Sequence, residues 1–143
     1  MKKAVVSPGA EVLLSGAPLP KSIAAKAARV GLITNPTGVL PNLRPTFDVL
    51  AELYTLAALF SPEHGVRGDV DAGGDVPDYV DEATGLPVYS TYGPGKGAAF
   101  RRMAELDCVF FDMQDVGARY YTYQYTMTES MEACAAFGVP FVV

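Results

Sequence analysis

Residues 30–60 read VGLITNPTGVLPNLRPTFDVLAELYTLAALF, and they hold two short apolar runs on either side of a helical pattern. The runs, at residues 30–34 and 56–60, are near-continuous, which is typical of parallel strands covered on both faces. Between them, apolar residues recur at the spacing of one helix face, at Phe47, Leu50, Ala51 and Tyr54. Pro45 is placed to open this helix, so the stretch predicts a strand–helix–strand unit.

The same alternation continues through the rest of the chain. Further apolar runs lie at residues 87–90, 108–112 and 139–143, separated by helical patterns at about 97–106 and 117–137. In the second helix we expect one stripe to pack on the sheet, formed by Tyr123, Met127, Met131 and Cys134. We therefore predict an α/β fold with a mainly parallel sheet and helices on both faces.

Two segments do not follow this alternation of strands and helices. The connection at residues 61–86 is rich in glycine and acidic residues and has no helical period, and loops of this length are usually functional or disordered. Residues 1–29 hold a possible short helix near residues 11–14 and an alanine-rich helical segment. We expect residues 1–29 to be a helical lead-in and residues 30–143 to be the α/β domain that carries the functional site.

The composition excludes several classes of protein. Of the 143 residues, 50% are hydrophobic and 19% are charged, the balance of a single compact domain with a buried core. The formal net charge is -5 and no basic stripe is present, which argues against nucleic acid or an anionic membrane as a partner. One histidine and two cysteines are too few for the common zinc sites or a disulfide scaffold. We expect no metal centre and two buried thiols.

The ends of the chain carry further expectations. The short apolar run after Lys2 and Lys3 breaks at Pro8, so the sequence predicts no export signal and leaves the compartment open. The longest apolar stretch, residues 53–60, is far shorter than the roughly 20 residues of a membrane span, so we expect none. The last predicted strand has no covering element after it, and we expect a truncated protein.

Polar residues follow four of the predicted strands. In an open α/β sheet, ligands bind beyond the carboxyl ends of the strands. These ends carry amide, carboxylate, hydroxyl and guanidinium groups, in residues 34–38, 61–68, 90–93 and 112–119. We therefore expect one site for a neutral or modestly charged ligand at this edge of the sheet.

Glu63 is the first candidate for a catalytic group. It follows Pro62 at the end of an apolar strand, where partial loss of water favours the protonated carboxyl that a general acid needs. The alternative is a carboxylate that caps a turn or pairs with Arg67. The neighbouring His64 could orient Glu63 or shuttle a proton, or it could be a hydrogen-bonded loop residue.

A second pair of carboxylates, Asp112 and Asp115, flanks Gln114 at the fourth strand end. Asp115 could cap the helix that follows. Carboxyl groups on neighbouring strand ends also suit glycoside hydrolysis, in which one protonates the leaving oxygen and another activates water or stabilises positive charge. Tyrosines just beyond could stack on a sugar or fill space between helix and sheet, at Tyr120, Tyr121, Tyr123 and Tyr125.

A glycine pattern leaves competing interpretations open. Residues 93–98, GPGKGA, match the relaxed dinucleotide fingerprint ahead of a predicted helix, with Asp112 at the end of the next strand. Pro94 removes a backbone donor beside the phosphate that such a loop would hold. A nucleotide-binding domain is therefore the runner-up, and a non-catalytic sugar-binding domain is the third hypothesis.

Four blocks together resemble a known family. In order within residues 30–143 they read GLITNPTG (31–38), SPEHG (61–65), TGLPVYS (84–90) and DMQDVGARYYTY (112–123). They are similar to blocks of the exo-β-N-acetylmuramidases, the peptidoglycan-recycling glycosidases of glycoside hydrolase family 171, formerly a domain of unknown function. The resemblance implies a Rossmann-like amino-terminal domain joined to a carboxy-terminal domain, with an active-site cleft that both form.

The resemblance also implies an activity, the release of N-acetylmuramic acid from the non-reducing ends of peptidoglycan fragments. The family's proposed catalytic glutamate falls on Glu63, which becomes the expected general acid, with His64 orienting it and Asp115 as the second carboxylate. The expected substrate-binding residues are Asn35, Arg67, Asp112, Gln114, Arg119 and Tyr120. Arginine suits bidentate capture of the lactyl carboxylate of muramic acid. No metal or organic cofactor is required.

The sequence departs from the family in two ways. Members continue past the strand at residues 139–143 into a second domain, so we expect part of the substrate cleft to be absent here and the activity of this chain alone to be doubtful. Many relatives are exported or lipid-anchored, whereas this amino terminus shows no such signal. The oligomeric state and the retaining or inverting outcome stay open.

Overall fold

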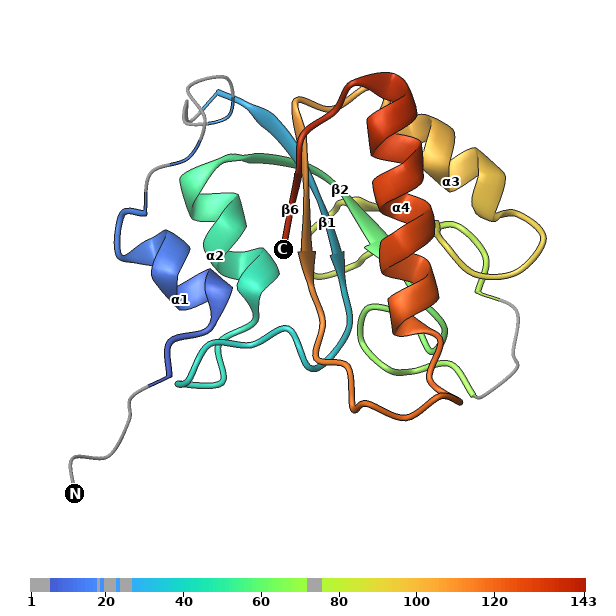
Figure 1. Cartoon of the computed structure of the whole chain (residues 1–143), viewed down its shortest axis with the longest axis horizontal. Helices are drawn as coiled ribbons and strands as arrows, with labels where there is room; N and C mark the ends of the chain where they lie inside the picture. Colours follow the sequence, from blue (N-terminus) through green and yellow to red (C-terminus); the bar gives the residue numbers. More distant parts are fainter. Residues whose placement is uncertain (1–5, 18, 20–22, 24–26, 72–75) are drawn as a thin grey trace.

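The computed structural model describes residues 6–17, 19, 23, 27–71 and 76–143 and shows one six-stranded sheet between two layers of helices (Figure 1). The strands are β1 (Arg29–Thr34), β2 (Thr55–Ser61), β3 (Tyr79–Val80), β4 (Pro87–Ser90), β5 (Cys108–Asp112) and β6 (Phe141–Val142). The helices are α1 (Gly9–Leu14), α2 (Thr46–Leu53), α3 (Lys96–Met103) and α4 (Tyr123–Phe137). This architecture confirms the predicted α/β class.

The sheet is parallel except at one edge. Its strand order is β3–β4–β2–β1–β5–β6, and β3 is the one described strand that runs antiparallel to its neighbour. From β1 the chain builds outward through β2 and β4, and it then returns to the other side of β1 for β5 and β6. The order therefore reverses beside β1, and in doubly wound sheets such a reversal opens a crevice at the carboxyl ends of the central strands.

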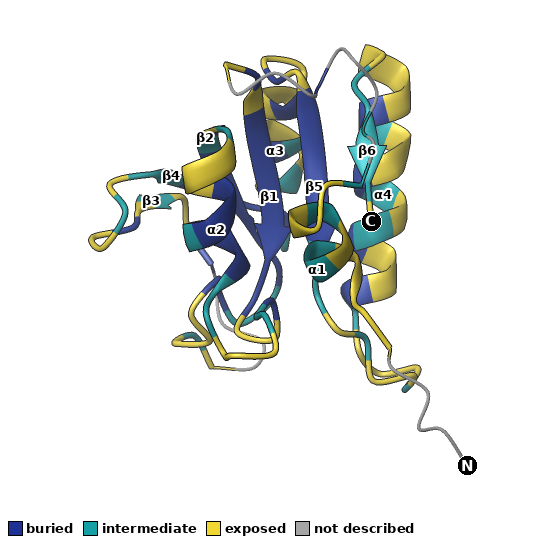
Figure 2. Ribbon diagram, turned by 90° about the vertical axis from the view of Figure 1, so that its left-hand side faces the viewer, coloured by how far each residue is buried: buried dark blue, intermediate teal, exposed yellow. Residues whose placement is uncertain are grey.

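The two faces of the sheet are covered by different helices, with the buried strands between them (Figure 2). Helices α1 and α2 cover one face, and α3 and α4 cover the other. On β1, Leu32 packs in the hydrophobic cluster beneath α2, whereas Ile33 packs in the cluster beneath α3 and α4. Gly31 lets that second cluster close tightly, because a Cβ there would lie 2.6 Å from Leu106 Cδ1 and 2.7 Å from Phe60 Cε2. The predicted helices on both faces are confirmed.

The strands agree with the sequence prediction at four of the five apolar runs and are shorter at the last, where β6 covers only two residues. The long connection at residues 61–86 is not irregular throughout, because it contains β3. A strand of two residues is too short to show an alternation of apolar and polar residues, and Val80 is exposed. The sequence pattern therefore does not predict this edge strand.

Helix α4 begins at Tyr123 rather than near residue 117, where the sequence predicts its start. Gly117 has a φ of 70°, a left-handed conformation that cannot continue a right-handed helix. The predicted stripe is also wrong at Met131, which is 46% exposed, while Ser130 is buried in its place. Successive steps of four residues advance about 40° beyond a full turn, so such a stripe drifts off the buried face.

The remaining helices differ little from expectation. Pro45 precedes α2 as its N-cap residue, and α3 ends at Met103, short of the predicted end. Helix α1 confirms the short helix near residues 11–14, whereas much of the alanine-rich segment lies outside the described residues. The division into a lead-in and a catalytic domain stays a prediction. None of the helices within the described ranges combines the length and the apolarity that crossing a bilayer demands.

Candidate active site

The polar strand ends meet at one edge of the sheet, the lower edge in Figure 1. In the parallel register, Thr34 at the end of β1 is level with Asp112 at the end of β5. Likewise, Ser61 at the end of β2 is level with Ser90 at the end of β4. The loops that leave these four strands therefore start side by side.

The ends of β1 and β5 are joined by a chain of hydrogen bonds. Asn35 is 3% exposed, and its Oδ1 accepts from the backbone N–H of Thr37 at 2.9 Å and from the Thr37 hydroxyl at 2.6 Å. Thr37 Oγ1 in turn accepts from the backbone N–H of Gln114 at 2.8 Å. The carboxamide oxygen of Asn35 is thus engaged in bracing the loop rather than offered to a ligand.

Glu63 is half-buried just after β2, where side chains from two other parts of the chain reach it. The Thr122 hydroxyl donates to Glu63 Oε2 at 3.2 Å, from the residue that precedes α4. The Tyr92 phenol, from the loop after β4, also interacts with the Glu63 carboxylate. The charge of Glu63 is the largest cause that raises the pKa of Tyr92, followed by burial and hydrogen bonding between the two side chains. Three elements thus converge on one carboxylate.

His64 folds its own loop back on itself. Its ring Nδ1 lies 3.0 Å from the backbone oxygen of Val70, and its own carbonyl accepts from the Val70 N–H at 3.2 Å. Its φ of 76° is left-handed, which is uncommon for a residue with a side chain. These contacts fit the hydrogen-bonded loop residue, and the role of His64 as an orienter of Glu63 stays a prediction.

Arg67 is paired with Asp81, not with Glu63. Its Nε and Nη2 donate to the two carboxylate oxygens of Asp81 at 2.6 and 2.8 Å, and its guanidinium lies over the Phe47 ring. The hydrogen bond from Arg67 is the largest cause that lowers the pKa of Asp81 to about 2, and Thr84 adds two more bonds. Asp81 is 2% exposed, so this pair ties the loop after β2 to the β3–β4 hairpin.

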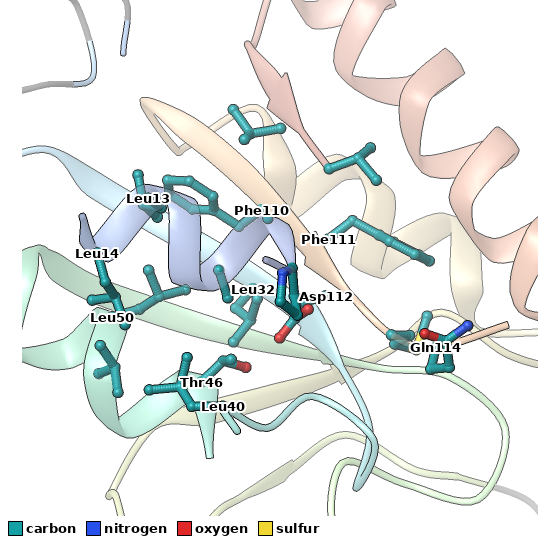
Figure 3. A pocket seen from close by; sticks show the side chains of 17 residues that line it. Leu13, Leu14, Leu32, Leu40, Thr46, Leu50, Phe110, Phe111, Asp112 and Gln114 are labelled. Atoms are coloured by element: carbon teal, nitrogen blue, oxygen red, sulfur yellow. The ribbon is translucent and has the colours of Figure 1, made fainter. Parts of the chain in front are cut away.

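Asp112 points to the face of the sheet that α1 and α2 cover, into an open apolar cavity of about 380 Å³ lined by residues of α1, α2, β5 and β6 (Figure 3). Burial raises the pKa of Asp112, and a hydrogen bond with Thr46 opposes the rise. Its Oδ2 is buried without a hydrogen-bond partner among the described residues. The cavity walls are otherwise mostly leucine, valine and phenylalanine side chains.

The loop after Asp112 bonds mainly within itself. Gln114 Nε2 donates to the backbone oxygen of Asp115 at 2.7 Å, and Asp115 Oδ1 accepts from the Gly117 N–H at 2.6 Å. Asp115 therefore stabilises a turn before α4 rather than capping the helix itself. Arg119 and Tyr120 follow on the surface, and Tyr120 is 95% exposed.

The predicted site residues are spread over two cavities and one carboxylate cluster. Asp112 and Gln114 line the 380 Å³ cavity, and Asn35 and Arg67 line a second cavity of about 210 Å³. Glu63 lines neither of these two. Tyr92 and Thr122, which contact Glu63, are absent from the sequence prediction, although Tyr92 lies in the third polar strand end and Thr122 lies among the tyrosines.

Other candidate chemistry finds less support at this edge. The glycine pattern at residues 93–98 follows β4 and opens α3, whereas dinucleotides bind where the strand order reverses, which here is beside β1. Cys108 and Cys134 are buried, and desolvation raises their pKa values to about 12 and about 11, so both thiols stay protonated. In the part of the chain that the structure describes, no three His, Cys, Asp or Glu residues are grouped as metal ligands.

Comparison with known proteins identifies relatives along most of the chain. Residues 30–143 match the family model described as "Exo-beta-N-acetylmuramidase NamZ, N-terminal". The chain is 52% identical over 120 residues to a protein of Bacillus subtilis (strain 168) named "Peptidoglycan beta-N-acetylmuramidase NamZ". Two crystal structures of DUF1343 family proteins from Bacteroides fragilis NCTC 9343 are similar, with TM-scores of 0.74 and 0.68 at 43% and 32% identity.

These matches cover most of this chain but a minor part of each relative. The match covers 82% of this chain and 29% of the Bacillus protein. The two Bacteroides structures match 92% and 94% of this chain, which correspond to 32% and 33% of their own chains. The similarity therefore concerns the N-terminal portion of a longer kind of protein.

Proposed function

Because the chain belongs to the exo-β-N-acetylmuramidase family and corresponds to its N-terminal part, we propose that it supplies the general acid of such an enzyme. The reaction is hydrolysis of the glycosidic bond at the non-reducing end of a peptidoglycan fragment, which releases N-acetylmuramic acid. The Bacillus relative carries the name of this activity. The chain spans 29% of that relative, so the proposal concerns the share of the chemistry that these residues supply.

The observation that carries the proposal is the placement of Glu63. Its carboxyl group is half-buried at the carboxyl edge of a doubly wound sheet, where ligands bind in this class of fold. It is contacted by the hydroxyl groups of Thr122 and Tyr92. A carboxyl group in such a place can protonate the glycosidic oxygen as its bond to the sugar carbon breaks.

The remaining predicted residues take supporting roles in this proposal. Asp115 is the second carboxylate, which stabilises the positive charge on the sugar ring or activates water. Its Oδ1 holds the turn at Gly117, while its Oδ2 is buried and has no hydrogen-bond partner among the described residues. Arg119 is exposed and bonds the lactyl carboxylate, and Tyr120 stacks on the sugar.

Four residues remain assigned to substrate binding with different support. Gln114 is exposed at the rim of the 380 Å³ cavity, and its side-chain N–H group donates to the Asp115 carbonyl. Arg67 is engaged by Asp81, and Asn35 by Thr37, so each would bind substrate only through the groups that these partners leave available. Asp112 faces the apolar cavity on the α1 and α2 side, which makes it the least favoured of the set.

The test is the turnover of a chromogenic β-N-acetylmuramide after Glu63→Gln, measured with this chain and with the Bacillus relative changed at the aligned residue. General acid catalysis contributes about 10²–10⁴-fold, so we expect kcat to fall by at least about 100-fold. Glu82→Gln, at an exposed glutamate farther along the same connection, is the matched control and keeps full activity. A Glu63→Gln variant with near-normal kcat would refute the assignment.

Binding separates this proposal from a nucleotide-binding function. We expect N-acetylmuramic acid to bind to the chain and NADH not to bind, in parallel titrations followed by NMR. Binding of NADH instead would favour the glycine pattern at residues 93–98 as the functional loop.

A further inference from the structure

We propose that Tyr92 and Thr122 are positioning residues for Glu63, whose two hydroxyl groups hold the carboxyl group in one orientation while it releases and regains a proton. This inference rests on the proposed function, which it extends by two residues that neither the sequence pattern nor the family resemblance singles out.

Thr122 is fixed by a well-packed helix. It is the N-cap residue of α4, and its backbone oxygen accepts from the N–H groups of Tyr125 and Thr126 at 3.0 and 3.1 Å. The helix is anchored on the sheet by four buried residues, Tyr123, Thr126, Ser130 and Cys134. The Thr122 hydroxyl therefore reaches Glu63 Oε2 from a rigid element rather than from a mobile loop.

Tyr92 is fixed by the sheet. The residue before it, Thr91, donates through both its backbone N–H and its hydroxyl to the carbonyl of Ser61, each at 2.8 Å. Ser90 Oγ also donates to the Tyr92 carbonyl at 3.0 Å. Ser61 lies two residues before Glu63, so the ends of β2 and β4 hold the phenol and the carboxylate beside each other.

The chemistry of the hydroxyl group explains why these residue types suit the task. A hydroxyl can donate to a carboxylate and can accept from a carboxylic acid, so the same pair of contacts serves both protonation states of Glu63. A lysine or arginine in either place would favour the ionised carboxylate alone. Because a misplacement of about 1 Å can cost about 100-fold in rate, holding the carboxyl group still has a direct effect on turnover.

The first experiment tests the contact in this chain without any assay of activity. Tyrosine is labelled with ¹³C in the ring, the Tyr92 signal is assigned with Tyr92→Phe, and its titration is followed by NMR. The Glu63 carboxylate raises the pKa of Tyr92, so Glu63→Gln should lower it toward the ordinary value, and Glu82→Gln should leave it unchanged. An identical Tyr92 titration in wild type and Glu63→Gln would overturn the proposal.

The second experiment tests positioning, with the chromogenic muramide and both proteins used for the Glu63→Gln test. We expect Tyr92→Phe and Thr122→Val each to lower kcat by about tenfold with KM nearly unchanged, and to shift the acid limb of the pH–rate profile. Thr122→Ser, which keeps the hydroxyl, should restore kcat to within about twofold of wild type. Thr128→Val, at an exposed position of α4, is the control.

The outcomes separate this inference from the proposed function. If Thr122→Ser is as impaired as Thr122→Val, or if the pH–rate profile stays in place, the two hydroxyls do not position Glu63 and the inference is wrong. If instead Glu63→Gln keeps its kcat while the Tyr92 titration still responds to it, the contact is real and the proposed function fails.

Discussion

Glu63 and Asp115 lie at the same edge of the sheet but are held in opposite ways. Glu63 is bonded by Thr122, which is 59 residues away in sequence, and by Tyr92 from a third element. Asp115 is bonded by Gly117, two residues away, and through its carbonyl by the adjacent Gln114. Glu63 is therefore tied to the ends of β4 and α4, whereas Asp115 bonds within its own loop, which the Gln114 N–H joins to Thr37.

Under the proposed function, this difference in hydrogen bonding fits the Glu63 cluster and the Asp115 loop to different tasks. Catalysis needs a group whose orientation is set in advance by packed elements, and this describes the Glu63 cluster. Recognition of a substrate tolerates, and often uses, a surface loop whose contacts are local. We therefore expect substitutions that loosen the connections of the Glu63 region to have large effects. Substitutions that change only the backbone of the loop at residues 113–120, with the Asp115 and Arg119 side chains kept, should have small ones.

The largest expected effect on stability comes from Asp81→Ala, which breaks the link between the loop after β2 and the β3–β4 hairpin. Asp81 is buried and accepts two bonds from Arg67 and two from Thr84. Bonds to a charged group contribute about 1.5–3 kcal/mol, so we expect a loss of about 3 kcal/mol in the free energy of unfolding, measured by urea denaturation. Asp71→Ala, at an exposed aspartate in the same connection, should change it by less than about 0.5 kcal/mol.

The same pair predicts a dependence of stability on pH. The pKa of Asp81 is lowered from 3.8 to about 2 in the folded protein, so its stabilising effect is complete above the unfolded value and is lost as pH falls through the folded value. We expect about 2 kcal/mol of unfolding free energy to disappear between about pH 4 and pH 2 through this group. Asp81→Asn should flatten the profile in that window, and an unchanged slope would contradict the assignment.

A smaller effect on stability is expected in the loop around Asp115, whose hydrogen bonds are mainly local. Gly117 has a φ of 70°, and Gly117→Ala places a side chain in a conformation that costs about 1 kcal/mol. Because nothing lies within 4 Å of the added Cβ, no further clash is expected. The Tyr92 titration should stay as in wild type. A shift of the Tyr92 titration would show that the Asp115 loop and the Glu63 cluster are coupled, which would contradict their independence.

The smallest effect is expected at Asp112, on the far face of the sheet. Burial raises the pKa of this carboxyl group, so the folded state loses stability as pH rises through the folded pKa and the group becomes charged. Asp112→Asn removes the charge, and we expect a gain of up to about 1 kcal/mol at pH 7, measured by thermal unfolding. A loss of stability would mean that the Asp112 carboxylate has a partner that the described contacts do not include.

The sequence predicts the central strands of the sheet well. It predicts the edge strand β3 and the start of α4 poorly, and both outcomes have physical reasons. Buried parallel strands need continuous apolar runs, which are visible at residues 30–34 and 108–112. An edge strand as short as β3 needs no such run, since Val80 is exposed. The start of α4 depends on the left-handed Gly117, and the identity of a glycine does not reveal the sign of its φ.

The site is predicted only in outline for a related reason. The ends of the predicted strands select Glu63 and Asp115 as candidates, because parallel strands finish at one edge. The partners of Glu63 depend on how β4 and α4 pack, and no local pattern specifies that Thr122 faces it. Similarly, the choice of Asp81 rather than Glu63 as the partner of Arg67 follows from the β3–β4 hairpin. Composition and spacing carry no information on either pairing.

We infer that the ligand binds at the Glu63 cluster rather than in the apolar cavity at Asp112. Mapping ¹⁵N–¹H chemical-shift changes in this chain on titration with N-acetylmuramic acid distinguishes the two places. We predict that the largest changes fall on the backbone amides of Glu63, Tyr92 and Thr122 and on those of the loop at residues 114–120. Changes confined to the cavity residues Leu13, Leu50 and Phe110, with the Glu63 cluster unmoved, would contradict it.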